Sequence, residues 1–290
     1  MKPAQFRYHD PSTVEEVLSV LAQFGDEAKI LAGGQSLVPL MNFRLARPMH
    51  LIDINKISSL DYLRHQDHAL VIGALARQRK IEFSELAMRK NPLLIEATRH
   101  IGHPAIRNRG TVCGSLAHAD PAAEWPALAL VMDATFVVRG AQDERQIPAS
   151  DFFVSYFTTC LGPQDFLIEI QVPELPERAG FCFQEVSRRH GDFALVGAAV
   201  WLTADAEGFC TDARIALAGV APCPVRARLA EQRLKGERVT DSVLAKVGSS
   251  IAEEIDPTSD LHASADYRRK VAGVIVQRAL RDAAQRIPAA

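Results

Sequence analysis

The sequence contains no uninterrupted apolar run close to the roughly 20 residues that a membrane-spanning helix requires, so we expect no integral membrane segment. Its first residues, MKPAQF, lack the apolar core of a secretory signal, which favours a cytoplasmic protein. An excess of charge is also missing, because 33 lysine and arginine residues stand against 35 aspartate and glutamate residues. This balance argues against nucleic acid or an anionic membrane surface as the main partner.

Cysteine is scarce and scattered through the chain. There are five, an odd number, at Cys113, Cys160, Cys182, Cys210 and Cys223. The pattern favours reduced thiols over a disulfide framework, and no two of them have the C-x-x-C spacing typical of iron–sulfur ligands. The nine histidines are not accompanied by a cluster of acidic or cysteine residues, so no metal site is predicted. A G-x-G-x-x-G dinucleotide fingerprint is absent as well.

The composition is that of an ordinary globular protein, with 48% hydrophobic and 23% charged residues among 290. This length is enough for two or three compact units. Residues 173–180, PELPERAG, are rich in proline and charge and indicate a domain boundary.

Beyond this boundary the pattern predicts three successive strands followed by helices only. The strands are expected over residues 180–188, 194–203 and 210–218, and the helices over residues 225–234, 241–253 and 266–286. An antiparallel sheet with helices on one face is the natural layering of such elements, within an α+β fold.

A short stretch near the N-terminus has the character of an anion site. Residues 29–32 are typical of a buried strand, which ends at the double glycine Gly33-Gly34, and a helix is expected to start at Ser36. Adjacent glycines permit positive φ angles and leave no Cβ in the way of a ligand. Successive N–H groups and a helix start favour a phosphate. Ser36 is expected to cap the helix or to donate its hydroxyl to the anion.

A second stretch, residues 108–121 (NRGTVCGSLAHADP), repeats this design roughly 75 residues later. It has a turn at Gly110, a β-prone Thr-Val-Cys, a Gly-Ser pair, and then Asp120 followed by proline as a predicted helix cap and first helical residue. Two such loops could face one elongated ligand that carries a diphosphate.

The two motifs, AGGQS at residues 32–36 and RNRGTVCGSLAHADPAAE at residues 107–124, closely resemble the FAD-binding medium subunit of the molybdenum hydroxylases. That family includes carbon monoxide dehydrogenase, quinoline and nicotine oxidoreductases, and bacterial xanthine dehydrogenases. The resemblance extends over essentially the whole chain. It implies a PCMH-type FAD-binding domain of two subdomains, residues 1–57 and 58–176, followed by a C-terminal α+β domain, residues 177–290.

The resemblance also implies roles for individual residues. The diphosphate is expected on the two loops, and the residues concerned are Ala32, Gly33, Gly34, Gln35, Ser36, Thr111, Gly114 and Ser115. Asp120 matches an aspartate that accepts hydrogen bonds from the flavin's hydroxyls, Leu167 a residue that packs near the flavin, and Phe193 an aromatic that shields one face of the isoalloxazine. Lys29 faces either the diphosphate or solvent. The alternatives are a plain helix cap for Asp120 and ordinary core positions for Leu167 and Phe193.

One position departs from the family pattern. The family usually has Thr-x-Gly-Gly where this chain has Thr111-Val-Cys-Gly114. Cys113 is therefore either a small buried apolar residue or a redox-active thiol beside the flavin. No histidine lies in the core of either loop, so we expect FAD to be bound non-covalently. Arg107 and Arg109 are expected to brace the loop, to meet a partner subunit, or to lie on a solvated face.

By resemblance, the chain is one subunit of a heterotrimer that pairs into a heterohexamer. A large subunit carries molybdopterin, a small one carries [2Fe-2S] clusters, and the FAD passes electrons to an external acceptor. No catalytic side chain is expected, because a flavin carries the redox chemistry itself. One alternative is a self-contained flavin oxidoreductase, with Gln184, Glu185 and His190 as the polar groups near the flavin. The other is a nucleotide-binding assembly module.

Overall fold

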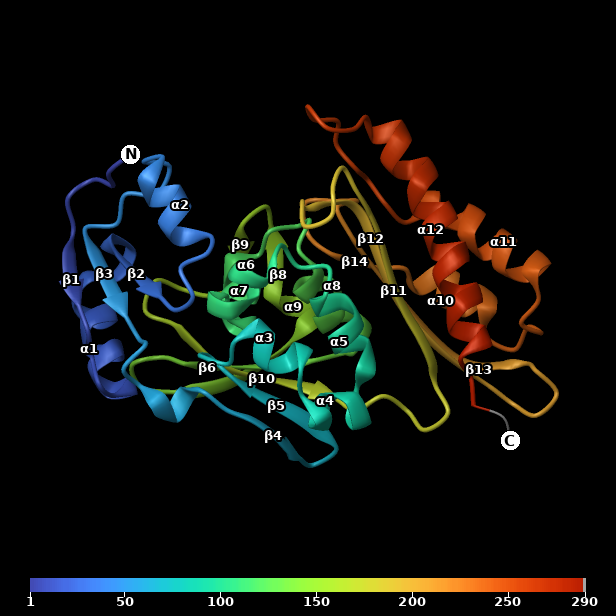
Figure 1. Cartoon of the computed structure of the whole chain (residues 1–290), viewed down its shortest axis with the longest axis horizontal. Helices are drawn as coiled ribbons and strands as arrows, with labels where there is room; N and C mark the ends of the chain where they lie inside the picture. Colours follow the sequence, from blue (N-terminus) through green and yellow to red (C-terminus); the bar gives the residue numbers. More distant parts are fainter. Residues whose placement is uncertain (289–290) are drawn as a thin grey trace.

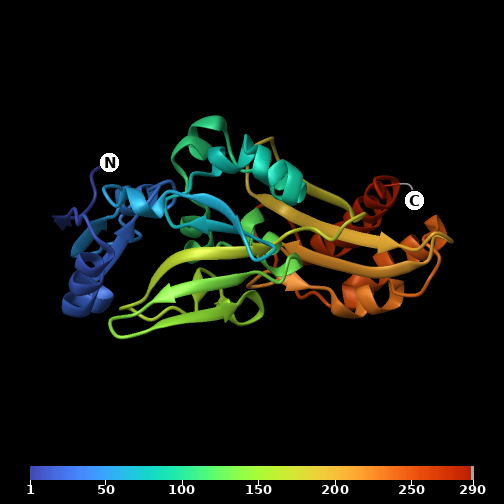
Figure 2. The same cartoon turned by 90° about the horizontal axis from the view of Figure 1, so that it is seen from below.

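The computed structural model describes residues 1–288, and its three main sheets follow one another along the longest axis of the molecule (Figure 1). The N-terminus lies at one end of this axis and the C-terminal helices lie at the other, as the orthogonal view in Figure 2 also shows. No helix among the described residues combines the length and the apolar character needed to cross a membrane.

The first sheet is parallel, with strand order β1-β3-β2. Its strands are β1 (Arg7–His9), β2 (Ala28–Leu31) and β3 (His50–Asp53), and its helices are α1 (Val14–Phe24) and α2 (Leu37–Asn42). Helix α1 forms because Val17, Leu18 and Leu21 share one buried face and the hydroxyl of Thr13 caps its first turn. Strands β2 and β3 end side by side, so the segments that follow them start at the same edge of the sheet.

The second sheet is antiparallel, with order β4-β5-β10-β6-β7. Its strands are β4 (Leu63–Gln66), β5 (Ala69–Gly73), β6 (Thr135–Arg139), β7 (Glu144–Pro148) and β10 (Phe166–Pro173). The accompanying helices are α3 (Gln78–Glu82), α4 (Glu85–Lys90), α5 (Pro92–Thr98), α6 (Pro104–Arg109), α7 (Val112–His118), α8 (Glu124–Val131) and α9 (Ala149–Phe152). A small hairpin, β8 (Phe153–Ser155) and β9 (Thr158–Thr159), follows α9.

The third sheet is also antiparallel, with order β11-β12-β13-β14. Its strands are β11 (Gly180–Ser187), β12 (Ala194–Ala204), β13 (Cys210–Ala218) and β14 (Val225–Arg226), and its helices are α10 (Arg228–Leu234), α11 (Asp241–Ser250) and α12 (Ala265–Gln285). Helices α10 and α12 pack on one face, as predicted. The prediction of helices only beyond the third strand is wrong, because residues 225–226 pair with β13 as β14 and the helix begins at Arg228. The other face is covered as well, by α5 and α8 from the preceding part of the chain.

Side-chain alternation explains why the third sheet is buried on both faces. Val200 and Leu202 of β12 lie in the core beneath α12, whereas Ala199 and Trp201 lie in the core shared with α5 and α8. Successive strand residues point to opposite faces, so a strand covered on both sides is apolar at nearly every position. The predicted α+β fold is confirmed, and the limits of the three predicted domains stay predictions.

Candidate functional site

The first glycine loop starts at the carboxyl end of β2 and is held by the segment that follows β3. The side-chain amide of Asn55 donates a hydrogen bond to the Ala32 carbonyl, 2.9 Å away. Gly34 has a φ angle of +71°, which favours glycine, and the Gln35 side chain donates to the Gly33 carbonyl at 3.1 Å. The loop is therefore a tight, internally bonded turn.

The backbone N–H groups of this loop are available to a ligand. Within residues 1–288, the N–H groups of Gly33, Gly34, Gln35 and Ser36 donate to no protein acceptor. The Ser36 hydroxyl does not cap α2, although Ser36 is its N-cap residue. Consecutive N–H groups without protein partners are the donors that an anion needs.

The structure brings the two glycine loops together. A Cβ atom on Gly33 would lie 2.8 Å from the Cα atom of Gly110 and closer still to the carbonyl oxygen of Arg109. Only glycine fits at such a contact. Two loops that are far apart in the sequence thus form one surface.

The second loop is a helix start, and its predicted β character is wrong. Thr111 is the N-cap of α7, and its hydroxyl accepts a hydrogen bond from the Gly114 N–H at 3.1 Å. Capping outweighs the weak β preference of Thr-Val-Cys because it satisfies a helix N–H that would otherwise lack a partner. Gly114 lies so close to the Thr111 hydroxyl that a Cβ would be only 2.5 Å from it.

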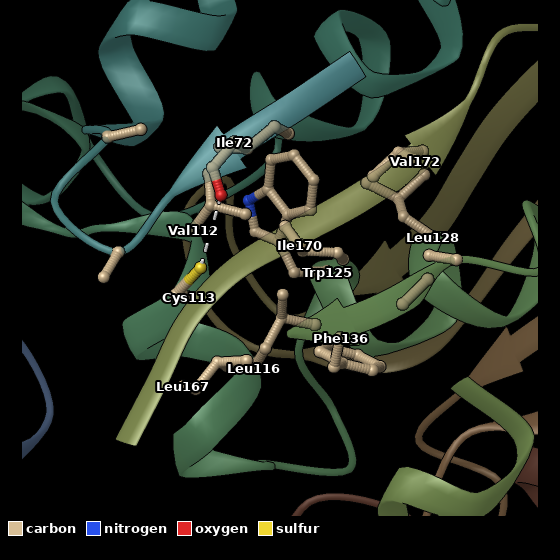
Figure 3. Packing of buried hydrophobic residues seen from close by; sticks show 14 of the residues in the cluster. Ile72, Val112, Cys113, Leu116, Trp125, Leu128, Phe136, Leu167, Ile170 and Val172 are labelled. Carbon is tan, nitrogen blue, oxygen red and sulfur yellow. Dashed lines mark hydrogen bonds between the residues drawn. The ribbon is translucent and has the colours of Figure 1, made fainter. Parts of the chain in front are cut away.

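Cys113 has a structural position in α7. Its side chain is buried and points to the Ile72 carbonyl, with Sγ 3.7 Å from the oxygen (Figure 3). Burial raises the pKa of the thiol, which keeps it protonated. Because the residue is helical and points into the core, the side chain needs no special φ, and the loop accommodates this departure from the family pattern. Leu167 of β10 is buried in the same apolar cluster.

Asp120 follows α7 but does not cap α8, which begins at Glu124 with Ala123 as its N-cap. Its carboxylate accepts a hydrogen bond from the Ala122 N–H at 2.9 Å, and burial raises its pKa. Helix α7 has seven residues and so spans about 10 Å between Thr111, its N-cap, and the turn that holds Asp120.

Glu124 is a residue that the sequence analysis missed. Its side chain is buried, and burial, together with the charge of Glu185, raises its pKa to about 8. Glu185, on β11, has one carboxylate oxygen 3.4 Å from His100 and the other without a partner among the described residues. The available signal was an acidic residue four positions beyond Asp120.

The remaining predicted residues lie at the surface. Lys29 is exposed on β2, three residues before the loop. Phe193 lies in the connection between β11 and β12, and 62% of it is exposed. The alternative that Phe193 is an ordinary core residue is therefore wrong. In the same connection, a Cβ on Gly191 would lie 2.7 Å from the ring of His103, so this segment packs beside the start of α6.

Arg107 is buried, so the solvated-face alternative is wrong for this residue. Its guanidinium forms two hydrogen bonds with the Glu82 carboxylate, at 2.8 and 3.0 Å, and both side chains are buried. It also donates to the carbonyls of Ile101 and Gly102. Arg109 keeps its side chain exposed.

The polar residues suggested for a self-contained enzyme do not converge. Gln184 donates to Asp282 of α12 at 2.6 Å, whereas Glu185 faces His100 at the end of α5. The two are neighbours on β11 and therefore point to opposite faces of the sheet. His190 is exposed.

Two family descriptions match successive parts of the chain. "FAD binding domain in molybdopterin dehydrogenase" matches residues 4–175, and "CO dehydrogenase flavoprotein C-terminal domain" matches residues 181–283. The alpha subunit of the 6-hydroxypseudooxynicotine dehydrogenase complex of Paenarthrobacter nicotinovorans is 43% identical, over 99% of this chain and 97% of that protein. Caffeine dehydrogenase subunit beta of a Pseudomonas species is 38% identical, over 99% and 97%.

A solved structure agrees with these matches. Carbon monoxide dehydrogenase from Hydrogenophaga pseudoflava, in a form lacking the Mo-pyranopterin moiety of the molybdenum cofactor, has a chain that superposes with a TM-score of 0.96 at 38% identity, covering 99% of this chain and 100% of that one. The chain belongs to the family of FAD-binding subunits of the molybdenum hydroxylases. The predictions of a flavoprotein component of an oxidoreductase, with FAD as its cofactor, are confirmed.

Proposed function

We propose that the two glycine loops hold the diphosphate of FAD. Gly33, Gly34, Gln35 and Ser36 would donate their free N–H groups, and Thr111, Gly114 and Ser115 would line the opposite side. The observation that carries this proposal is the row of four N–H groups without protein acceptors, on a loop seated directly on the second loop. The loops fit the group, because their close contact leaves no room for a Cβ on Gly33 and the first loop offers consecutive N–H donors to an anion.

The rest of the cofactor would extend from the loops toward the C-terminal part of the chain. Ala32 would contribute backbone contacts, Asp120 would accept hydrogen bonds from hydroxyls, and Leu167 and Phe193 would flank the ring system. Lys29 would add a positive charge near the first loop. Bound FAD supplies the redox chemistry, because a flavin exchanges electrons singly or in pairs.

The complex around this subunit is also proposed. The chain would receive electrons from a small iron–sulfur subunit, served by a large molybdopterin subunit, and pass them to an external acceptor in the cytoplasm. Two heterotrimers would form a heterohexamer. The family membership and the relatives' multi-subunit names support this arrangement. It is tested by the absorption spectrum and the native mass of the protein purified from its own host, together with identification of the co-purifying chains.

The loop assignment is tested by Gly34→Val, which should leave a folded protein with little flavin. Gly208→Val is the matched control, because Gly208 also has a positive φ, +85°, but lies in a remote hairpin with open space around it. Both substitutions strain the backbone, and only the first obstructs the loop. Normal FAD content in the Gly34 variant would refute the assignment.

A further inference from the structure

A chain of hydrogen bonds connects the two glycine loops through side chains that neither loop contains. The Asn55 amide donates to the Ala32 carbonyl at 2.9 Å, at the start of the first loop. The guanidinium of Arg77 donates to the side-chain oxygen of Asn55 at 2.5 Å through one nitrogen. Through another nitrogen it donates to the carbonyl of Arg109, in the second loop. We call this connection the Asn55–Arg77 bridge.

The bridge ends at the contact between the loops. The Arg109 carbonyl that accepts from Arg77 is the same oxygen against which Gly33 is packed. The guanidinium therefore fixes the position of the atom that sets how closely the first loop can approach the second.

Both members of the bridge are themselves held in place. Asn55 donates from its backbone and its side chain to Asp53, at 2.9 and 2.6 Å, and Asp53 accepts from the Tyr8 hydroxyl at 2.7 Å. On the other side, the backbone around Arg77 pairs with that around Thr111, through bonds from Gln78 to Gly110 at 2.9 Å and from Val112 to Ala76 at 3.1 Å. Asn55 is thus anchored to the end of β3, and Arg77 to the backbone at the start of α7.

We propose that Arg77 is a positioning residue that sets the spacing of the two glycine loops and, through that spacing, the affinity for FAD. The inference rests on the proposed placement of the diphosphate on these loops. Arginine suits the role because its planar guanidinium offers several donors at fixed angles, so one side chain reaches two acceptors at once. Lysine, with a single mobile ammonium group, cannot hold both in the same geometry.

Charge must be separated from geometry, because a cation near a diphosphate attracts it at any spacing. Asn55 is uncharged, so removing its amide breaks the bridge without changing the charge of the site. The test is a double-mutant cycle with Asn55→Ala, Arg77→Gln and the two combined, and Arg77→Lys is measured alongside. Arg79→Gln is the matched control, since Arg79 is exposed on α3, the helix that has Arg77 as its N-cap. The dissociation constant for FAD is measured on the deflavinated full-length chain by the change in flavin fluorescence.

Each single variant should weaken FAD binding about tenfold, and the combined variant should be little weaker than either, because both break one bridge. Arg77→Lys should behave like Arg77→Gln, and Arg79→Gln like the wild type. Additive losses, or wild-type affinity in Arg77→Lys, would overturn the proposal. If Arg77→Gln does not fold, Asn55→Leu serves alone: it keeps a similar volume and adds no charge, but it can neither donate to Ala32 nor accept from Arg77, and unchanged affinity would overturn the proposal.

Failure of the bridge and failure of the loop assignment give different results. If Gly34→Val binds FAD normally, the diphosphate does not lie on the first loop. If Gly34→Val loses FAD while the Asn55 and Arg77 variants keep it, the loop assignment stands and the bridge proposal is wrong.

Discussion

Glu124 begins helix α8 with its carboxyl group almost fully removed from water, 5% of the residue being exposed. Burial raises its pKa to about 8, and the negative charges of Glu185 on β11 and Asp120 before the helix add to the effect. In the unfolded chain the pKa returns to its ordinary value of 4.5. Between these two values the folded protein binds a proton that the unfolded chain has released.

The stability contributed by this proton is therefore fully present below about pH 4.5 and is lost as the pH rises toward 8. Between pH 4.5 and 8, the free energy of unfolding that this proton contributes falls by about 1.4 kcal/mol per pH unit at most. Glu124→Gln should be more stable than the wild type at pH 8 and should show a flatter pH profile between pH 5 and 8. Urea unfolding of the flavin-free protein at several pH values measures this, and parallel profiles for the two proteins would contradict it.

Phe193, one of the proposed flavin neighbours, is 62% exposed. If its ring covers one face of the isoalloxazine, Phe193→Ala should retain FAD but admit solvent to that face. Quenching of the bound flavin's fluorescence by iodide should then increase. Phe209→Ala, at an exposed phenylalanine in the hairpin between β12 and β13, is the control and should leave quenching unchanged. If iodide quenches the flavin fluorescence equally in both variants, Phe193 does not cover the isoalloxazine.

At the scale of elements, the Arg107–Glu82 ion pair joins α6 to α3 beneath the second loop. Arg107→Met would leave the Glu82 carboxylate buried without a partner, which costs about 3–5 kcal/mol of unfolding free energy. Adding Glu82→Leu should recover most of this loss, because an apolar pair of similar volume needs no compensation. Urea denaturation of the three proteins measures the difference. A double variant as unstable as Arg107→Met would show that the packing of the arginine, and not the unpaired charge, is what matters.

The parts of the fold and of the site that could be predicted are those that depend on residues close together in the sequence. The strands β11, β12 and β13 and the two glycine loops follow from short-range patterns of apolar residues and glycines, and the prediction of the α+β fold was correct. Thr111–Cys113 was assigned wrongly because a β preference was weighed without the capping hydroxyl. Asn55 and Arg77 were not predicted, because their hydrogen-bond partners lie 22 to 32 residues away and only the folded chain brings them together. The cover of α5 and α8 over the third sheet likewise depends on packing between distant segments.

At the scale of the whole molecule, the third sheet joins the flavin-binding part to the C-terminal helices. Trp201 of β12 is buried, and its indole N–H donates to the Val131 carbonyl at the end of α8, 3.1 Å away. Glu96 of α5 accepts from the Phe183 N–H of β11 at 2.9 Å and from Arg286, just beyond α12, at 2.7 Å. Because of these hydrogen bonds, the stability of the flavin-binding part and the stability of the C-terminal part depend on each other.

We therefore expect the wild-type chain to unfold in one cooperative transition, with calorimetric and van't Hoff enthalpies in a ratio of about one. Trp201→Ala removes the largest side chain at this junction and costs about 3–5 kcal/mol, most of it from contacts between the two parts. The variant should show two separate transitions, and the transition of the part that carries the glycine loops should shift more when FAD is added, because that part holds most of the proposed site. A single transition that moves to lower temperature as a whole would mean that the two parts are coupled through the rest of the sheet as strongly as through Trp201.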